Sequence, residues 1–530
     1  MELKKVEKIV IKHSNVPAIG DSSFWPGASL KHLDLSHNKI TIIQESDFNG
    51  LSHLEVLNLS HNLIDMAPSA PFRFLTNLTH LCMARNRLTK LVPRLFFKLS
   101  KLEHLDLSSN PLTEINPVDI RDVRQLKSLF LANCQLQRLH SLVYQGLTNL
   151  EELDLRNNRF SSLAPEEFKS LKKLRSLLLD GNQLIAIADY TFKGLKLKEL
   201  GLSRNKLISL SDCAFCDCTF NSLDISRNKF TFFSSKLLQY TSDSLIFLNV
   251  EGNNLTNAAN VYNLIEPLTA LQTLSIANMS LDDSMRDDFF AKLESVLWSL
   301  DISGNKIVNL SSNLLKPLKA LKQLDLSSNQ MQRLDSDVLR VLNSMSSLRS
   351  LFLHDNPWLC YQCFIVPLLE WIASNPQPYN NVCRKGTAFC ARCSQPSSIK
   401  DKPLDFVYRT QLEWCVDPSI QLRVSVSEPH VGLVLALLII ISLVIVIIVV
   451  VVMYRKQGAV YYTHEDDRLD EKTVFTIQSV AKSLATPPLS SSAPSSSSST
   501  SPHSSPPLRH SIPRHSVEFN EEETKPKTRI

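Results

Sequence analysis

Glycine is scarce in this chain, with 12 glycines among 530 residues, and the motifs that depend on glycine-rich loops are absent. The sequence contains no G-x-G-x-x-G, Walker, G-x-S-x-G or H-E-x-x-H motif. Enzymes carry these motifs because their chemistry needs a phosphate cradle, an exposed nucleophile or a pair of metal ligands. We therefore expect no enzyme, no cofactor and no catalytic metal.

A strong excess of one charge is also absent. The formal net charge is +5 at pH 7, and basic and acidic residues are mixed along the chain. Proteins that bind nucleic acids concentrate lysine and arginine in one region. The composition therefore predicts no nucleic-acid partner.

The dominant feature is a repeated line of leucines. Residues 102–112 read L-x-x-L-x-L-x-x-N-x-L, and the pattern recurs at 30–40, 150–160, 297–307 and 321–331. The asparagine position, called the mark below, recurs fifteen times at spacings of 23 to 27 residues. The marks are Ser14, Asn38, Asn62, Asn86, Asn110, Cys134, Asn158, Asn182, Asn205, Asn228, Asn253, Met279, Asn305, Asn329 and Asn356.

This pattern resembles the leucine-rich repeat, in which each repeat adds one short strand to a parallel sheet. Alternate leucines point inward, and an inward asparagine hydrogen-bonds backbone groups that the turn leaves unpaired. Phenylalanines such as Phe48, Phe72 and Phe96 follow the marks by ten residues and fill the outer half of the core. The predicted fold is an α/β leucine-rich-repeat solenoid of about fifteen repeats, with a curved parallel sheet, over residues 1–356. Met279 cannot donate a hydrogen bond, so we expect a distorted turn there.

The first residues, Met1 to Val10, are too charged to form the apolar core of a signal peptide. Ile9 and Ile11 already occupy leucine positions of a repeat. We expect that an N-terminal cap and a signal peptide precede this sequence in the full gene. The alternative is that the first repeat is itself a divergent cap.

The outward residues of the strands form the concave surface on which such a solenoid binds its partners. His32, His80 and His104 share one outward column, most simply as solvated polar residues. An outward aromatic side chain adjoins charges of both signs in the sixth and seventh repeats. We predict that the partner-binding residues are Phe130, Glu152, Asp154 and Arg156.

Five N-x-S/T sequons lie before residue 430 and none after it. Their acceptors are Asn58, Asn77, Asn254, Asn278 and Asn309, which we predict to be glycosylated. Their distribution favours an extracellular solenoid. Asn58 would place its glycan on the concave strand itself.

A cysteine-rich block, residues 357–418, follows the repeats and resembles the C-terminal cap of extracellular leucine-rich-repeat proteins. It departs from that family in having C-x-x-C in place of C-x-C, and six cysteines in place of four. We predict three disulfides, with fifteen possible connectivities, among Cys360, Cys363, Cys383, Cys390, Cys393 and Cys415. The alternative is a tetrahedral Zn²⁺ held by the two C-x-x-C pairs. Cys213, Cys216 and Cys218 form a further cluster with no assignment.

Residues 431–453 contain no charged side chain and are followed by Tyr454-Arg455-Lys456. At about 1.5 Å per residue, a helix of this length spans a ~30 Å hydrocarbon core. The positive flank predicts a plasma-membrane protein whose residues 1–430 are extracellular, with 419–430 as a juxtamembrane linker.

The last segment, 454–530, is expected to be a disordered cytoplasmic tail because its Ser/Pro-rich part, residues 483–516, has little apolar surface to bury. Its terminus, Thr528-Arg529-Ile530, fits the S/T-x-apolar pattern that PDZ scaffold domains bind as an added strand. Thr528 and Ile530 are the predicted scaffold-binding residues.

The whole layout resembles single-pass leucine-rich-repeat membrane proteins of the cell-adhesion and matrix-organising kind. The resemblance implies a surface protein that binds extracellular or matrix proteins. The alternative is an innate-immune or developmental receptor with a Toll-like ectodomain, acting as co-receptor or decoy because no signalling domain follows the membrane.

Overall fold

The computed structural model describes residues 5–25, 29–255, 257–384, 387–415 and 429–458, with the side chains of the last segment described over 438–453. The chain divides into two compact units, Met1–Arg423 and Val424–Ile530. In the second unit the described element is helix α8, Pro429–Gly458.

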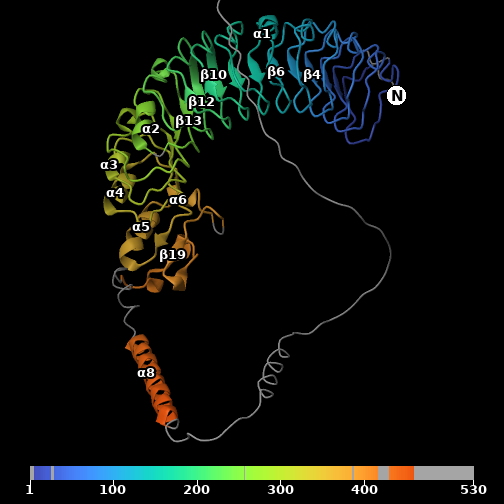
Figure 1. The fold of residues 1–530 in the computed structure, drawn as a ribbon. Helices are drawn as coiled ribbons and strands as arrows, with labels where there is room; N and C mark the ends of the chain where they lie inside the picture. The colour runs from blue at the N-terminus through green and yellow to red at the C-terminus, as the bar shows by residue number, and fades with distance from the viewer. Residues whose placement is uncertain (1–4, 26–28, 256, 385–386, 416–428, 459–530) are drawn as a thin grey trace, which may run out of the picture. The chain divides into compact units, whose positions relative to one another are not determined.

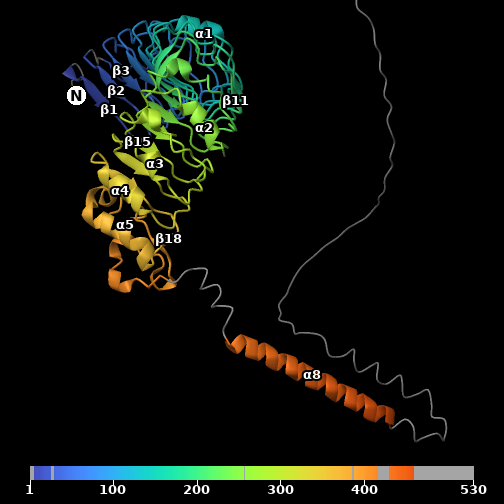
Figure 2. The same ribbon diagram turned by 90° about the vertical axis from the view of Figure 1, so that its left-hand side faces the viewer.

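The first unit is a solenoid built on one parallel sheet of fifteen strands, joined in the order of the sequence (Figure 1). The predicted solenoid is thereby confirmed, with about fourteen turns between the first strand and the last. Figure 2 shows its first strands following one another from the N-terminal end. The strands are β1 Lys8–Val10, β2 His32–Asp34, β3 Val56–Asn58, β4 His80–Cys82, β5 His104–Asp106, β6 Ser128–Phe130, β7 Glu152–Asp154, β8 Ser176–Leu178, β10 Lys196–Gly201, β12 Thr219–Asp224, β13 Phe247–Asn249, β14 Thr273–Ser275, β15 Ser299–Asp301, β16 Gln323–Asp325 and β17 Ser350–Phe352.

The return segments carry short elements on the outer side of the coil. A second, two-stranded parallel sheet pairs β9, Ala186–Ile187, with β11, Ser209–Leu210. The helices are α1 Ser141–Gly146, α2 Ala258–Ile265, α3 Ser312–Leu315 and α4 Ser336–Ser344. The outer segments of the early repeats stay as turns.

The core consists of the inward leucines and of the predicted column of aromatic rings. Leu57, Leu81 and Leu105 face one another across consecutive strands and are fully buried. The rings of Phe168 and Phe192 stack at 6.0 Å between centroids, and those of Phe192 and Phe215 at 5.9 Å. Continuous packing along the coil means that each repeat completes the core of its neighbours.

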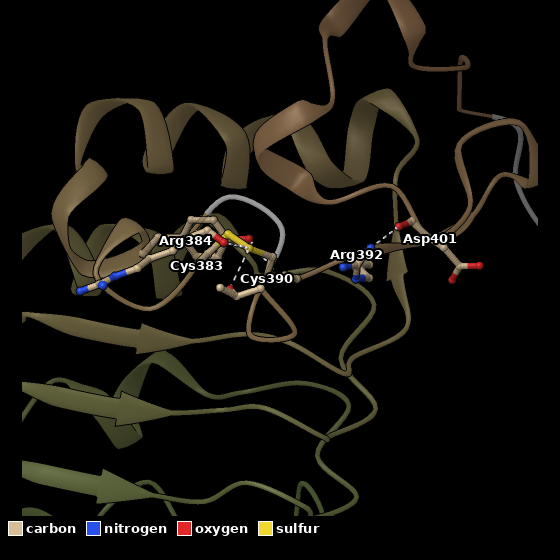
Figure 3. Close-up of a disulfide and its surroundings, with 8 residues drawn as sticks. Cys383, Arg384, Cys390, Arg392 and Asp401 are labelled. Atoms are coloured by element: carbon tan, nitrogen blue, oxygen red, sulfur yellow. Dashed lines mark hydrogen bonds between the residues drawn. A yellow bond between two sulfur atoms is a disulfide. The ribbon is translucent and has the colours of Figure 1, made fainter.

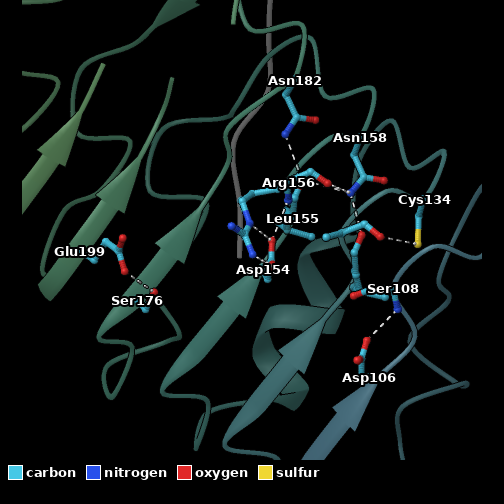
Figure 4. A network of polar contacts seen from close by, with 12 residues as sticks. Asp106, Ser108, Cys134, Asp154, Leu155, Arg156, Asn158, Ser176, Asn182 and Glu199 are labelled. Carbon is cyan, nitrogen blue, oxygen red and sulfur yellow. Dashed lines mark hydrogen bonds and ion pairs between the residues drawn. The ribbon is translucent and has the colours of Figure 1, made fainter. Parts of the chain in front are cut away.

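The asparagine marks form a ladder of hydrogen bonds beneath the turns (Figure 4). The Asn182 amide nitrogen donates to the carbonyls of Leu155 and Leu179, each at 2.9 Å. Its Oδ1 accepts the backbone N–H of Phe160, in the preceding repeat, at 3.1 Å. One side chain thus supplies the partner of the Phe160 N–H and shares the two carbonyls with the neighbouring asparagines, Asn158 and Asn205.

The marks Cys134 and Met279 alter this pattern. Cys134 Sγ lies 3.7 Å from the Leu107 carbonyl, and the N–H of Leu112 bonds the Asn110 carbonyl at 2.8 Å. At Met279 the turn gains a second left-handed residue, Ser280, with φ of 60°. The expected distortion at Met279 therefore takes the form of an extra left-handed residue.

The cysteine-rich block closes the last turn with β18 Trp358–Leu359, α5 Gln362–Ser374, α6 Pro376–Asn380 and β19 Cys393–Gln395. Three disulfides join Cys360 to Cys393, Cys363 to Cys415 and Cys383 to Cys390. Figure 3 shows the last of these beside Arg392, whose Nη1 donates to the Asp401 carbonyl at 2.9 Å. The two C-x-x-C pairs are thus consumed by disulfides and do not form one tetrahedral zinc site.

A fourth disulfide, Cys213–Cys216, lies within one outer segment and leaves Cys218 as a buried thiol. This cluster could not be assigned from the sequence, because pairing within a C-x-x-C depends on the turn that the chain makes there.

A search of the residues whose side chains are described finds no helix long and apolar enough to cross a membrane. The predicted linker 419–430 lies mostly outside the described residues, and the predicted tail 454–530 mostly beyond them, including Thr528 and Ile530.

The ladder predicts a large effect for the substitution Asn182→Ala. It leaves the buried N–H of Phe160 unpaired and removes one of the two asparagine donors to each of the Leu155 and Leu179 carbonyls, so the free energy of unfolding should fall by about 1–3 kcal/mol. Gln183→Ala, at the exposed neighbouring position, is the control and should change it by less than about 0.5 kcal/mol. Chemical denaturation measures both, and equal stabilities would contradict the role assigned to the ladder.

The cap predicts a graded response to loss of disulfides. Replacing Cys360 and Cys393 by serine should lower stability by about 2–5 kcal/mol. The same change at Cys213 and Cys216, which closes a much shorter loop, should cost about 2 kcal/mol less. Non-reducing peptide mapping checks the pairing, and free thiols with bound zinc in the cap would refute it.

Candidate functional site

The concave face is built from two outward columns of side chains, contributed by the first and third residues of the strands. In the early repeats Val56, His80 and His104 lie side by side in the first column. Asn58, Cys82, Asp106 and Phe130 follow one another in the second. Adjacent strands are about 4.8 Å apart, so each column is a continuous row.

These early residues line an apolar hollow of about 260 Å³ between β3 and β6. The imidazole rings of His80 and His104 stack at 4.3 Å, while His32 is separated from them by Val56. Burial, and then the neighbouring His104, lowers the pKa of His80. Burial raises the pKa of the Cys82 thiol to about 11. Both groups are thus neutral at pH 7, and Asp106 is the acidic residue of the lining.

Three of the four predicted partner-binding residues are accessible, and one is not. Phe130 and Glu152 are half-buried, and Arg156 is exposed. The Asp154 side chain is only 4% exposed, because Arg156 Nε and Nη2 bind its two oxygens at 3.0 and 2.7 Å (Figure 4). Its carboxylate is therefore held by the turn, and the contact of Asp154 with a partner stays a prediction.

The same turn chemistry recurs along the solenoid. Asp154 Oδ1 also accepts the backbone N–H of Arg156 at 3.0 Å, and Asp106 does the same for Ser108 at 2.9 Å. Asp34, Asp224, Asp301 and Asp325 repeat this bond. The sequence shows this feature as an acidic residue four positions before the mark. An acidic residue at that position indicates a side chain that caps the turn rather than one that binds a partner.

Gly201 is the exception, because it occupies this position without a side chain. Ser203 there donates both its N–H and its hydroxyl to Asp180 Oδ1, each at 2.8 Å, from the preceding repeat. A Cβ on Gly201 would lie 2.3 Å from Asp180 Oδ2. The glycine therefore makes room for a carboxylate borrowed from the neighbouring turn.

A charged hollow of about 400 Å³ opens around Gly201 and Asp180, and we call the use of Asp180 by the turn of Gly201 the carboxylate exchange. Its walls include Arg156, Asp180, Glu199, Arg204, Asp224, Arg227 and Glu251. Arg227 and Glu251 form an ion pair at 3.1 Å, and burial raises the pKa of Asp180. Arg204 has no ion pair within the described part of the chain and remains available to a ligand.

A second row of histidines was missed by the sequence analysis. His13, His37 and His61 each precede a mark with left-handed backbone, and their rings stack at 4.6 and 4.0 Å. Burial, and then His37 and Arg85, lowers the pKa of His61. Reading the column one residue before each mark would have found this row.

The sequon asparagines occupy different places on the coil. Asn58 lies on the concave strand β3, and Asn77 is half-buried before β4. Asn254, Asn278 and Asn309 are exposed on the turns after the strands.

Among the described residues one group of three has metal-ligand spacing, namely Cys383, Cys390 and Asp405, whose ligand atoms lie within 4.8 Å of one another. Two of its members are bonded in a disulfide. The arrangement offers surfaces for binding rather than groups for catalysis.

The exchange at Gly201 predicts that Gly201→Ala lowers the free energy of unfolding by about 1–3 kcal/mol, because it drives Asp180 away from Ser203. The double variant Gly201→Asp with Asp180→Ser restores the pattern of the other repeats and should recover most of this loss. Chemical denaturation of the unsubstituted protein and the two variants is the test. A double variant that is less stable than Gly201→Ala would disprove the carboxylate exchange.

The comparisons with known proteins agree with this architecture. The Leucine rich repeat family matches residues 4–64, 66–112, 76–136 and 124–184. The BspA type Leucine rich repeat region, described as six copies, matches residues 161–275. No curated protein sequence matches the chain.

Solved structures share its fold at low sequence identity. TLR13 in complex with ssRNA13 superposes with a TM-score of 0.59 at 22% identity, over 76% of this chain and 57% of that one. A leucine-rich-repeat protein of Leptospira interrogans has a TM-score of 0.49 at 23% identity, over 67% and 86% of the two chains. An internalin of Listeria monocytogenes has a TM-score of 0.46 at 21% identity, over 66% and 87%.

The chain therefore spans 57% of the TLR13 structure that it resembles. Both family matches and the fifteen-stranded sheet lead to one assignment: the chain belongs to the leucine-rich-repeat proteins.

Proposed function

We propose that this protein is a cell-surface receptor or adhesion protein that holds an extracellular or matrix protein against its concave face. The observation that carries the proposal is the charged hollow from Arg156 to Glu251, which follows directly on Phe130. Buried aromatic and arginine anchors beside charges of both signs are typical of protein interfaces. The repeat scaffold itself is a binding framework and carries no catalytic constellation among its described residues.

Each part of the hollow has a definite role in this proposal. Arg204 supplies a cation that has no ion-pair partner among the described residues. Glu199, which accepts a hydrogen bond from the Ser176 hydroxyl at 3.4 Å, supplies an anion. Gly201 between them lowers the floor, so that a partner side chain can approach the backbone. Phe130 offers half-buried aromatic surface at the edge.

The proposed location is the plasma membrane, with the solenoid outside. Support comes from the charge-free residues 431–453, which lie within α8, from the basic residues that follow, and from sequons confined to residues before 430. An antibody to the solenoid should stain intact cells. Staining that appears only after permeabilisation would contradict the orientation.

The tail is proposed to bind a PDZ scaffold through Thr528 and Ile530. A terminal strand would pair with the domain, whose pockets take the isoleucine side chain and hydrogen-bond the threonine hydroxyl. A pull-down with the native tail and with one lacking Ile530 checks this. Recovery of the same scaffold by both tails would sink the idea.

A second candidate is a ligand receptor of innate immunity or development, acting as a co-receptor or decoy. The likeness of fold to TLR13, solved with ssRNA13, favours it. Proximity labelling at the cell surface distinguishes the candidates. Matrix or junction proteins around the solenoid support the first, and microbial or cytokine-like ligands support the second.

A charge reversal in the hollow predicts loss of partner capture. Glu199→Lys combined with Arg204→Glu should weaken binding by about tenfold or more. The double variant reverses the charge of both exposed side chains, which should cost about 1–2 kcal/mol of binding free energy. Arg340→Glu, on the outer helix α4, is the matched control and should bind normally. Unchanged binding by a folded double variant would place the site elsewhere.

A further inference from the structure

We propose that the apolar hollow between β3 and β6 seats a glycan carried by Asn58 of the same chain. The protein-binding part of the concave face then begins at Phe130. This inference rests on the extracellular location given under the proposed function, and it names the occupant of the hollow and the boundary of the binding surface.

The side chain of Asn58 is oriented for this modification. Its Oδ1 accepts the backbone N–H of Ser60 at 3.0 Å, and its Nδ2 has no hydrogen-bond partner among the described residues. Ser60 is also the hydroxyl residue of the sequon. Because the hydrogen bond fixes the oxygen, the amide nitrogen that would carry the glycan is the free end of the side chain.

Three other sequons differ in this respect. The amide nitrogen of Asn77 donates to the Ser52 carbonyl at 2.7 Å. Those of Asn278 and Asn309 donate to Glu251 and Asp283, each at 3.2 Å. A glycan on any of these must replace an existing hydrogen bond, whereas one on Asn58 replaces none.

The hollow begins where the glycan would be attached. Cys82 is the neighbour of Asn58 in its column, one strand spacing of about 4.8 Å away, and His80 is the neighbour of Val56. Phe130 is three spacings, or about 14 Å, from Asn58 and stands at the far end. The first sugar therefore covers Cys82 and His80 and leaves the outer side of Phe130 open.

The chemistry of the walls suits an N-acetyl sugar. Val56 and the stacked faces of His80 and His104 offer apolar surface to the acetyl methyl and the ring C–H groups. Asp106 and the imidazole nitrogens offer hydrogen bonds to the hydroxyl groups. The site is concave, so a covalently attached sugar covers surface that would otherwise face water.

The modification requires an oligosaccharide donor held on a lipid pyrophosphate, which the secretory pathway supplies. Asn58 Nδ2 loses a proton and forms a bond to the anomeric carbon of the sugar. The bond between that carbon and the pyrophosphate oxygen breaks, and the lipid pyrophosphate leaves.

The free thiol of Cys82 is a built-in reporter for the test. Cys82 is half-exposed in the wall of the hollow, while the other free cysteines of the described chain, Cys134 and Cys218, are buried in the core. The full chain, expressed in cells that glycosylate asparagine, is labelled with a maleimide before and after enzymatic removal of N-glycans. Peptide mapping then gives the rate of labelling at Cys82 and the occupancy of each sequon.

Asn58→Asp is the matched variant, because Asp34 and Asp106 make the same turn bond at 3.0 and 2.9 Å from the equivalent position. We expect Asn58 to be occupied, and Cys82 to react about tenfold faster after deglycosylation and in Asn58→Asp, since reactivity follows access. Asn278→Asp, which removes a glycan from an exposed turn, should leave the Cys82 rate unchanged.

Equal rates of maleimide labelling at Cys82 in the glycosylated and deglycosylated protein would overturn the proposal that the glycan lies in the hollow. An empty Asn58 beside glycans at the other sequons would overturn this inference alone. A chain with no glycan at any sequon would overturn the extracellular location as well.

Discussion

The pairing of backbone groups at the turns is the constraint on which the structure depends. Every turn of the coil buries N–H and carbonyl groups that no strand can pair, and burial without a partner costs about 1–3 kcal/mol for each group. The asparagine ladder answers this cost with one side chain per repeat, bonded to its own turn and to the preceding one, as Asn182 is. The coupling between neighbours follows from the same bonds that permit the fold.

This constraint also explains which parts of the protein the sequence could foretell. Leucine and asparagine positions recur because each satisfies a requirement of its own repeat, so the solenoid and its aromatic column were predictable. The connectivity of the cap and the burial of Asp154 depend on how turns meet in space. The exchange between Asp180 and Gly201 depends on two repeats at once, and no period in the sequence reports such a pair.

The candidate site arises where the repeat is irregular. Six turns hold their own carboxylate, as Asp106 and Asp224 do, and these carboxylates are occupied by hydrogen bonds of the turn. At Gly201 the carboxylate comes from elsewhere and the floor of the sheet is bare. On a surface made of identical units, recognition by a partner requires such exceptions, because a uniform row would bind a ligand equally well in every register.

Cys134 interrupts the ladder between the repeat of Asn110 and that of Asn158 (Figure 4). Its thiol makes one long contact across that boundary, from Sγ to the Leu107 carbonyl at 3.7 Å, and the N–H of Leu112 bonds the Asn110 carbonyl of its own turn at 2.8 Å. A coil under tension or bending yields first where its turns share fewest bonds. The substitution lies between the histidine-bearing turns and those of the charged hollow, so local opening of the coil should cost less free energy at this boundary than at one that two asparagines span.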